Sequence, residues 1–417
     1  MVKQALIFLL SLLITSQLYA QGANNGAVVP PIRHVRISLM TVGQGDMIWE
    51  AFGHSCIRVI DSAREGKMHD LVFNYGTFDN FDQNFGKKLM DGTLLYYLSV
   101  FPYDFFANVF VEKGRSLKEQ VLVLNDRQRT DLANNLEVNT LPQNKYYHYD
   151  FFTDNCCTRI YDMVAKTLGT GFVPGDAIPK GEPISFYEGS YQYYQYRHWE
   201  RTGIALLFEH RMNMPVTDAD VLFLPDYLSK AFDKATLNGK KAVETPVIFA
   251  TDTRPQHKPL NGPLIFTSVI AMLTIAGLSW RPARLPGNIM SYAVLFMSGL
   301  LGCIMLYAWF GTTHSGCEDN LNLLWALPTN LVIIFFKPAI RAKYALAGII
   351  LLCLCIILYM LRIMVMPLIE ITPFLLSLVW VYAAMYRRTL SPTAMACNHF
   401  PHHFCCILFA TAVCFWL

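Results

Sequence analysis

The sequence predicts an exported domain of mixed α+β structure, followed by an all-α bundle of five or six transmembrane helices. Three features support this fold class: a short apolar leader, strand and helix patterns between residues 37 and 164, and repeated long apolar runs after residue 262. Of the 417 residues, 53% are hydrophobic and only 16% are charged, which is unusual for a soluble protein. Because the apolar excess is concentrated in the leader and the C-terminal part, it indicates a membrane half.

Residues 1–20 are typical of a secretory signal peptide. Lys3 precedes a short apolar run over residues 5–14, and the small residue Ala20 stands directly before Gln21. We predict cleavage after Ala20, with a retained signal anchor as the alternative. In both cases the chain from Gln21 onward is exported.

The exported core is predicted to cover residues 21–164. Four segments have the composition of strands, residues 35–41, 56–60, 71–75 and 117–124. A helix is expected over residues 126–136 with Asn125 as its N-cap, and a second over residues 154–167. Residues 165–262 are interpreted as an extension and linker, with an aromatic stretch at 186–199, a helix at 221–232 and a polar, proline-containing segment at 240–259.

The transmembrane domain is predicted to cover residues 263–417. Five apolar runs are about long enough to span a bilayer, residues 263–278, 289–310, 321–336, 344–366 and 371–386. A sixth run, 404–417, is shorter and leaves the count at five or six. The loops expected inside the cell contain lysine and arginine, whereas the outer loop 311–320 contains neither, as the positive-inside tendency requires.

Charge and cysteine usage exclude several function classes. The net charge of +3 is too small to indicate nucleic-acid binding. Only Cys56, Cys156 and Cys157 of the 11 cysteines precede the membrane half, so the exported part has no disulfide framework. The histidines at 399, 402 and 403 match no standard zinc spacing, and we predict no metal and no other cofactor.

A cysteine and a histidine form the strongest candidate for chemistry. Cys156 falls at the start of a predicted helix, where unpaired amides and the helix dipole favour the reactive thiolate. His54 lies at the start of a predicted strand and is the candidate base, and Asn74 on the next strand is the candidate that orients it. His69 and Asp150 are weaker candidates for the third group. Two alternatives stay open: Cys157 as the nucleophile, and a purely structural role for the pair.

A second polar group lies in the predicted outer loop of the membrane half. His314, Asn320 and Asn322 gather there with Glu318 and Asp319. Polar residues that enter a membrane span are costly and often functional, so they are candidates for binding a lipid headgroup or an acceptor amine. The alternative is a solvated loop in which Asn322 caps a helix.

Four motifs resemble a known family. They are Trp49-x-x-Phe-Gly-His54, Phe73-Asn-Tyr-Gly76-Thr-Phe78, Tyr149-x-Phe-x-x-Asp-Asn-Cys156-x-Thr-Arg159, and Thr313-His314 with Asn320-x-Asn322-Leu-Leu-Trp325. The order of histidine, polar residue and Asn-Cys resembles the circularly permuted papain-like enzymes, the group of lecithin:retinol acyltransferase. The whole chain is similar to the Bacteroides-type lipoprotein N-acyltransferases, and it departs from their pattern at Cys157, where a small polar residue is expected.

The resemblance implies a permuted papain-like core and a membrane-bound enzyme. It would move an acyl chain from a phospholipid, through a thioester on the cysteine, to the α-amine of a lipoprotein's lipid-modified N-terminal cysteine. It also implies a multi-pass protein of the bacterial inner membrane with its N-terminal domain in the periplasm. The implied catalytic residues are Cys156, His54 and Asn74. The implied substrate-binding residues are Trp49, Glu50, Tyr75, Asn155, Arg159, His314, Asn320, Asn322 and Trp325.

Two rival functions fit part of the pattern. A cysteine peptidase or amidase acting on peptidoglycan would use the same thiol and imidazole, but it needs only an anchor and not a helix bundle. A non-catalytic envelope scaffold that binds lipid or protein would need no reactive thiol. Analysis of lipoproteins and of muropeptides separates the enzymes, and thiol labelling of Cys156 separates both from the scaffold.

Overall fold

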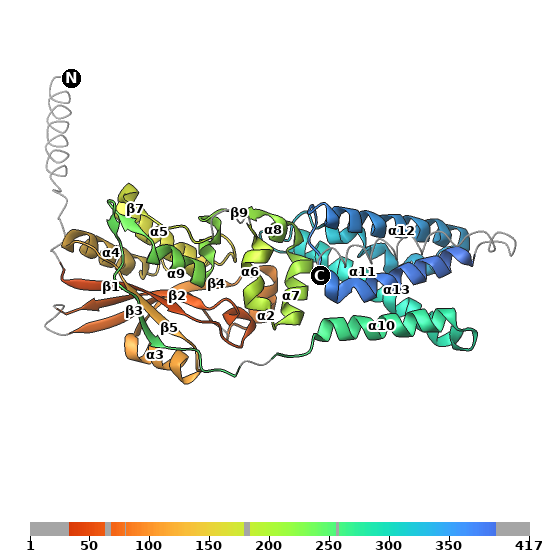
Figure 1. The fold of residues 1–417 in the computed structure, drawn as a ribbon, viewed down its shortest axis with the longest axis horizontal. Coiled ribbons are helices and arrows are strands. Elements are labelled where there is room, and N and C mark those ends of the chain that lie inside the picture. The colour runs from red at the N-terminus through yellow and green to blue at the C-terminus, as the bar shows by residue number, and fades with distance from the viewer. Residues whose placement is uncertain (1–32, 63–67, 80, 179–183, 256–257, 389–417) are drawn as a thin grey trace, which may run out of the picture.

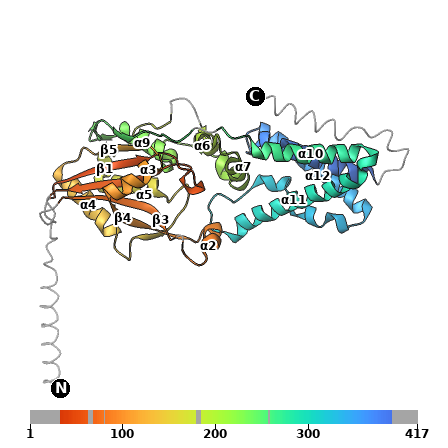
Figure 2. The same ribbon diagram turned by 90° about the horizontal axis from the view of Figure 1, so that it is seen from below.

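The computed structural model describes residues 33–62, 68–79, 81–178, 184–255 and 258–388. The predicted signal peptide (1–20), the last apolar run (404–417) and the histidines at 399–403 lie outside the described residues. The described chain is elongated, with a β-sheet domain at one end and a bundle of long helices at the other (Figure 1). Smaller helices lie between the two parts (Figure 2).

The sheet has seven strands in the order β12-β5-β1-β2-β3-β4-β6, and every neighbouring pair is antiparallel. The strands are β1 Val35–Val42, β2 His54–Asp61, β3 His69–Phe78, β4 Leu95–Pro102, β5 Leu117–Val121, β6 Tyr146–His148 and β12 Val247–Ala250. The four predicted strands are confirmed as β1, β2, β3 and β5. The other three were missed: β6 has only three residues, β12 lies in the segment interpreted as a linker, and β4 was not predicted although its aromatic residues favour a strand.

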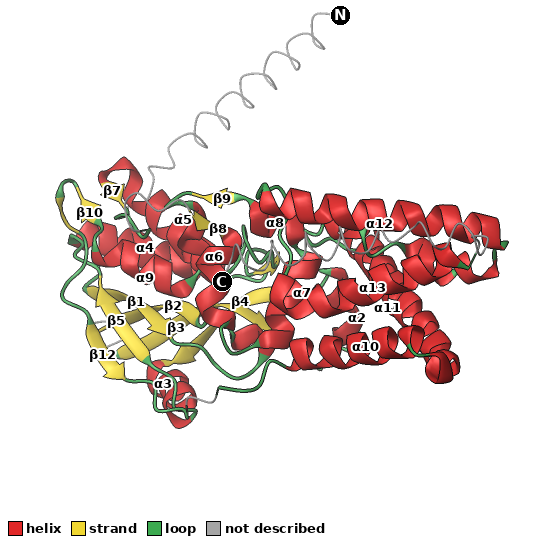
Figure 3. Cartoon of the chain, turned by 45° about the vertical axis from the view of Figure 1, so that its right-hand side comes forward, coloured by secondary structure: helices red, strands yellow, loops and turns green. Residues whose placement is uncertain are grey.

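Helices cover both faces of the sheet (Figure 3). One face carries α4 Asp126–Asn139, α5 Cys156–Leu168 and α9 Pro225–Asp233, and the other carries α3 Tyr103–Glu112. Alternate residues of β1 serve the two layers, because successive side chains of a strand point to opposite faces. Ile37 and Leu39 belong to the larger core with α4 and α5, whereas Met40 and Val42 pack with Phe106 of α3.

The helices predicted to begin at residues 126 and 154 are confirmed to within two residues as α4 and α5. The helix predicted over 221–232 begins only at Pro225, as α9. Asn125 caps α4, and its side chain accepts a hydrogen bond from the amide of Gln128. The shorter elements are η1 Ile48–Glu50, α2 Phe85–Asp91, η3 Gly169–Gly171, β7 Phe172–Val173, β8 Ile184–Ser185, α6 Phe186–Tyr194, α7 His198–Leu207, α8 Glu209–Asn213, β9 Pro215–Val216, η4 Asp220–Phe223, β10 Thr236–Leu237 and β11 Lys240–Lys241.

Four helices in the described residues are long and apolar enough to cross a membrane. They are α10 Gly262–Ser279, α11 Arg284–Gly311, α12 Pro338–Met360 and α13 Leu368–Arg387, and the short η5 Arg281–Ala283 connects the first two. α13 packs against both α10 and α12, and α10 also packs against α11. The positively charged segments at 337–343 and 387–388 lie at the end of the bundle away from the sheet, where Arg341 and Arg388 line one cavity.

The prediction of a third transmembrane helix over residues 321–336 is wrong. Residues 321–336 form three short 3₁₀ helices, η6 Leu321–Leu324, η7 Pro328–Leu331 and η8 Ile333–Phe335. Pro328 has no amide hydrogen and interrupts a regular helix. Irregular backbone is tolerated at membrane depth only inside the protein, and the buried Asn330 satisfies its side chain there by bonds to Ser298, Tyr344 and Tyr382. The described residues therefore contain four long helices, and the predicted count of five or six stays a prediction, because the run 404–417 lies outside the described residues.

Buried polar contacts join the sheet domain to the bundle. Arg201 of α7 forms an ion pair with Glu370 of α13, and Asn261 also donates to this carboxylate over 3.0 Å. The carboxylate of Glu209 accepts the amides of Leu321 and Val365 at 3.0 and 2.9 Å. At a third point, Tyr307 of α11 donates to Asp91 of α2. Because α2 follows β3 directly, the sheet end that holds the start of β2 and the end of β3 faces the bundle.

Candidate active site

His54 and Asn74 lie together on neighbouring strands at this bundle-facing end. His54 Nε2 donates to Asn74 Oδ1 across 2.5 Å, since an amide oxygen can only accept. The Asn74 amide is itself oriented, because its Nδ2 donates to Thr77 Oγ1 over 2.9 Å. Thr77 Oγ1 in turn lies 2.5 Å from Ser99 Oγ of β4. Asn74 thus fixes the His54 ring and leaves Nδ1 available for proton exchange with another group.

Cys156 is the first residue of α5, and Asn155 is the N-cap. Asn155 Oδ1 accepts the amides of Cys157 and Thr158 at 2.8 and 3.1 Å, and Nδ2 donates to the carbonyls of Phe151 and Phe223. The amide of Cys156 is not among those that the cap uses. Asn155 is therefore a buried cap that holds the helix start in place, which leaves the Cys156 amide for a substrate oxygen.

The pKa directions describe a thiolate paired with an imidazolium. A hydrogen bond from Cys157 lowers the pKa of Cys156, burial opposes it, and the charge and hydrogen bond of His54 lower it further, to well below the usual range. Burial lowers the pKa of His54, but the charge and hydrogen bond of Cys156 and the bond to Asn74 outweigh it, so the pKa is raised. Cys156 and His54 therefore favour each other's charged form.

Cys157 has the opposite character. Burial is the largest cause that raises its pKa far above the usual range, and Cys156 adds to the effect. Its Sγ lies 3.9 Å from that of Cys156 and 3.5 Å from Ser55 Oγ, and the residue is fully buried. Of the two cysteines, Cys156 has the base and the lowered pKa, whereas Cys157 keeps its proton.

A distortion of β3 brings the helix start and the imidazole together. The pairing of β3 with β4 shifts between Asn74 and Thr77, and Gly76 has φ of +93°, a conformation that favours glycine. A β-carbon on Gly76 would lie 3.9 Å from His54 Cε1 and 4.0 Å from Cys156 Cβ. Gly76 therefore borders the same small space as the two candidate catalytic side chains.

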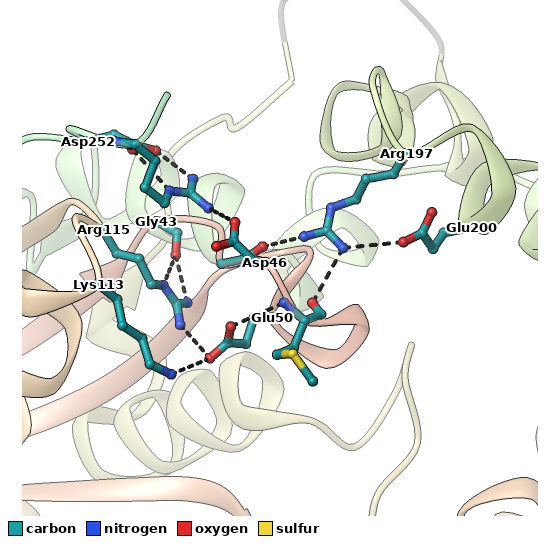
Figure 4. Close-up of polar contacts among 11 residues, drawn as sticks. Gly43, Asp46, Glu50, Lys113, Arg115, Arg197, Glu200 and Asp252 are labelled. Carbon is teal, nitrogen blue, oxygen red and sulfur yellow. Dashed lines mark hydrogen bonds and ion pairs between the residues drawn. The ribbon is translucent and has the colours of Figure 1, made fainter. Parts of the chain in front are cut away.

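The loop before His54 is held by charged residues from three other segments (Figure 4). Glu50 accepts from Lys113 at 3.3 Å and from Arg115 at 3.1 Å, and Arg115 also donates to the carbonyl of Gly43. The other contacts are Arg254 with Asp46 and Asp252, and Arg197 with Glu200 and the carbonyls of Gly45 and Met47. The Glu50 carboxylate is thus engaged within the protein and fixes the loop that precedes His54.

The tip of this clamped loop exposes apolar side chains. Met47, Ile48 and Trp49 expose 47%, 56% and 51% of their surface, respectively. The Trp49 ring makes an edge contact with Phe78 at 6.1 Å. Ring contacts continue from Phe78 to Tyr96 at 5.3 Å and from Tyr96 to Tyr149 at 4.6 Å. These rings connect the exposed tip with the segment that precedes Cys156.

Tyr75 and Arg159 lie beside the same space, and neither side chain is fully exposed to solvent. Tyr75 is buried, and its ring centroid is 6.5 Å from that of Tyr147. Arg159 pairs with Asp154 at 2.6 Å, and its guanidinium carbon lies 3.6 Å from the centroid of the Tyr147 ring. The other two candidates for the third group act elsewhere: Asp150 caps the turn at Thr153, and His69 is at the far end of β3.

The four candidates in the membrane half lie at the junction between the two parts. His314 Nε2 is 3.2 Å from the carbonyl oxygen of Leu89 in α2. Asn320 Nδ2 donates to the carbonyls of Leu206 and Leu207, and Asn322 Oδ1 accepts from the buried Trp325 indole at 2.8 Å. Their polar groups thus serve the docking of the loop onto α2 and α7. Ser315 of the same loop donates to Asp150, six residues before Cys156.

Sequence reasoning assigned no role in the site to several residues near it: Ser55, Thr77, Ser99, Gly76 and Tyr147. Small hydroxyl residues and single tyrosines give no pattern of their own. The pairing of β4 with β3 and with β6 reveals Thr77, Ser99 and Tyr147, and the contact with Cys157 reveals Ser55. The glycine in Phe73-Asn-Tyr-Gly76 was the one available signal. Among the described residues, no group of three or more histidine, cysteine or acidic side chains is placed to hold a metal ion.

Two family models match the chain. Residues 30–174 match the model described as the Lnb N-terminal periplasmic domain, and residues 252–392 match the Lnb transmembrane domain. The first match contains Cys156, His54 and Asn74, and the second contains all four long helices. No curated protein and no solved structure matches the chain.

Proposed function

The chain belongs to the Lnb-type lipoprotein N-acyltransferase family, and from this premise we propose that it transfers an acyl chain from a phospholipid to the α-amine of a lipoprotein's lipid-modified N-terminal cysteine. The observation that carries the proposal is the placement of Cys156 and His54 beside the same small space at Gly76, with His54 oriented by Asn74, at the sheet end that faces the helix bundle. A nucleophile, a base and an orienting group in this order are the components of covalent acyl transfer. We assign the bundle to the inner membrane and the sheet domain to the periplasm.

In the first half-reaction, the Cys156 thiolate attacks the ester carbonyl of the phospholipid. The carbonyl π electrons move to oxygen and form a tetrahedral oxyanion, which the free amide of Cys156 stabilises. The oxyanion then collapses, the ester C–O bond breaks, and the His54 imidazolium gives its proton to the departing alkoxide. The products are an acyl thioester on Cys156 and a lysophospholipid.

In the second half-reaction, the acceptor amine attacks the thioester carbonyl. His54, now neutral, takes a proton from the nitrogen, and the C–S bond breaks as the second oxyanion collapses. An amide forms on the lipoprotein, and the thiolate–imidazolium pair is restored. The raised pKa of His54 and the lowered pKa of Cys156 suit a thiol that leaves as a thiolate.

The architecture supports lipid substrates. Donor and acceptor are both held in the membrane, and a tethered site meets them at a higher effective concentration than a free enzyme would. The exposed tip at Met47, Ile48 and Trp49 is suited to acyl chains, since large apolar side chains held out by a rigid loop mark lipid or protein contact sites. We assign Trp49 and Tyr75 to the donor side of the site. His314, Asn320, Asn322 and Trp325 then shape the junction where the acceptor approaches.

Replacing Cys156 by serine in cells that depend on the chain tests the proposal. N-terminal peptides of lipoproteins are expected to lose the N-linked acyl chain, whereas the matched Cys157→Ser variant keeps it. Muropeptides are profiled in the same strains. Normal N-acylation in the Cys156→Ser strain would refute the proposal, and a change confined to muropeptides would assign the same residues to peptidoglycan cleavage instead.

A further inference from the structure

Tyr147 of β6 places a buried hydroxyl without a partner beside the candidate nucleophile. The residue is 6% exposed, and its Oη has no hydrogen-bond partner within the described part of the chain. Buried hydroxyls almost always have a hydrogen-bond partner, because an unpaired hydroxyl loses its hydrogen bonds to water without a replacement. An exception next to a reactive thiol therefore calls for a partner that arrives with the substrate.

The position of the hydroxyl is well defined. A β-carbon on Gly76 would lie 4.0 Å from Tyr147 Oη, at nearly the same distance as from His54 Cε1 and Cys156 Cβ. The three groups thus border one small space, which glycine leaves open. β6 pairs with β4, where Tyr96 stands opposite Tyr147, and the Arg159 guanidinium covers the ring at 3.6 Å. These contacts hold the phenol in one orientation.

We propose that Tyr147 is a catalytic residue that donates a hydrogen bond from Oη to the oxyanion formed on the acyl carbonyl, an inference that rests on the proposed acyl transfer. When the Cys156 thiolate bonds to the carbonyl carbon, the π electrons move to oxygen, and this oxygen accepts from Oη–H and from the Cys156 amide. The tyrosine keeps its proton throughout. The bond weakens again when the electron pair returns and the alkoxide, or later the thiolate, leaves.

The electrostatics of the phenol suit a donor that does not ionise. Burial raises the pKa of Tyr147, and the nearby Cys156 charge adds to this, while Arg159 opposes it. The hydroxyl therefore stays protonated over the pH range in which the thiolate forms. The Arg159 cation over the ring also withdraws electron density, which makes the O–H a better donor.

The test measures acylation of the purified full chain in phospholipid vesicles without acceptor, by intact mass over time. Tyr147→Phe preserves the ring and removes the hydroxyl, and its acylation rate is expected to fall by about 10²–10³-fold, as for the loss of one oxyanion donor. The rate and pH profile of Cys156 alkylation should stay unchanged, because the tyrosine does not activate the thiol. Tyr146→Phe is the matched control, since this half-exposed neighbour on β6 points away from the site.

A hydroxyl restored as 3-fluorotyrosine at position 147 should recover most of the rate, which a merely structural role of the ring would not predict. Thermal unfolding of each variant shows whether it is folded. The inference is overturned if Tyr147→Phe acylates as fast as Tyr146→Phe, if its thiol loses reactivity in parallel, or if fluorotyrosine gives no recovery. If the wild-type chain forms no adduct at all, the proposed function fails instead.

Discussion

The Sγ atoms of Cys156 and Cys157 lie 3.9 Å apart, and of the two cysteines only Cys156 pairs with the imidazole of His54. The hydrogen bond from Cys157 is the largest cause that lowers the pKa of Cys156. The second cysteine is therefore a positioning residue for the nucleophile, although it was itself a candidate for that role.

Changing Cys157 should shift the reactivity of Cys156 according to what replaces it. Cys157→Ser retains a donor, so alkylation of Cys156 should keep its dependence on pH. Cys157→Ala removes the donor and should move the alkylation profile to higher pH. The profiles are measured with a thiol probe followed by peptide mapping, and identical profiles for serine and alanine would contradict the assigned hydrogen bond.

Removing the imidazole should raise the pKa of the Cys156 thiol. In the wild type the thiolate persists below the ordinary cysteine pKa of about 8.5, so labelling should remain fast at neutral and mildly acidic pH. In His54→Gln, labelling should become fast only at alkaline pH, and acyl transfer should fall by about 10²–10⁴-fold. If the labelling profile of His54→Gln matches that of the wild type, the imidazole does not lower the pKa of the Cys156 thiol.

Asn74 should act through the orientation of His54. Asn74→Ala removes the acceptor for Nε2 and is expected to lower kcat more than it raises KM, because the ring is free to turn. Asn74→Asp keeps an acceptor and adds a charge, which should raise the pKa of His54 further and shift the alkaline limb of the pH–rate profile upward. Steady-state kinetics across pH for both variants checks this, and full activity in Asn74→Ala would remove Asn74 from the site.

The N-cap of α5 should contribute measurable stability. Asn155→Ala removes the acceptor for two amides and is expected to cost about 1–2 kcal/mol. The buried carbonyls of Phe151 and Phe223 also lose their donor, so Asn155→Ala should lower the stability more than Asn125→Ala at the exposed cap of α4. Thermal unfolding in detergent compares Asn155→Ala with Asn125→Ala, and equal shifts for the two would argue against the buried contacts.

The ion pair of Arg201 and Glu370 should control docking of the sheet domain on the bundle. Glu370→Gln leaves a buried guanidinium without its counter-charge, and losing one partner of such a pair costs about 3–5 kcal/mol. The double variant Arg201→Met with Glu370→Gln should regain part of this stability. Limited proteolysis within residues 251–261, with unfolding curves in detergent, measures both, and additive effects would show that the pair is not coupled.

Local patterns of residues predicted much of the fold. The alternation in 35–41 and 56–60 specified β1 and β2, and Asn125 and the Asp-Asn before Cys156 located two helix starts. The order of His54, Asn74 and Cys156 along the chain also predicted which side chains meet. For the strands and helix starts a short segment contains the information, because strand alternation and helix capping are local. The meeting of His54, Asn74 and Cys156 was expected from the resemblance to a known enzyme group, because these residues lie far apart in the sequence.

Other features depend on contacts between distant segments. The run 321–336 has the hydropathy of a transmembrane helix, yet it forms short 3₁₀ turns. Pro328 interrupts the helix, and the Asn330 side chain forms hydrogen bonds with residues of α11, α12 and α13. Likewise, Glu50 precedes His54 closely and resembles a substrate ligand, but Lys113 and Arg115 engage its carboxylate. Neither partner set can be recognised from the segment itself.

Intact-mass analysis of the full chain with phospholipid and no acceptor shows directly whether Cys156 forms an acyl thioester. We predict an added mass of one acyl chain, mapped to Cys156, absent in Cys156→Ser and released when a lipoprotein N-terminal peptide is supplied. An unmodified chain under these conditions, or an acyl group on Cys157 instead, would contradict acyl transfer through Cys156.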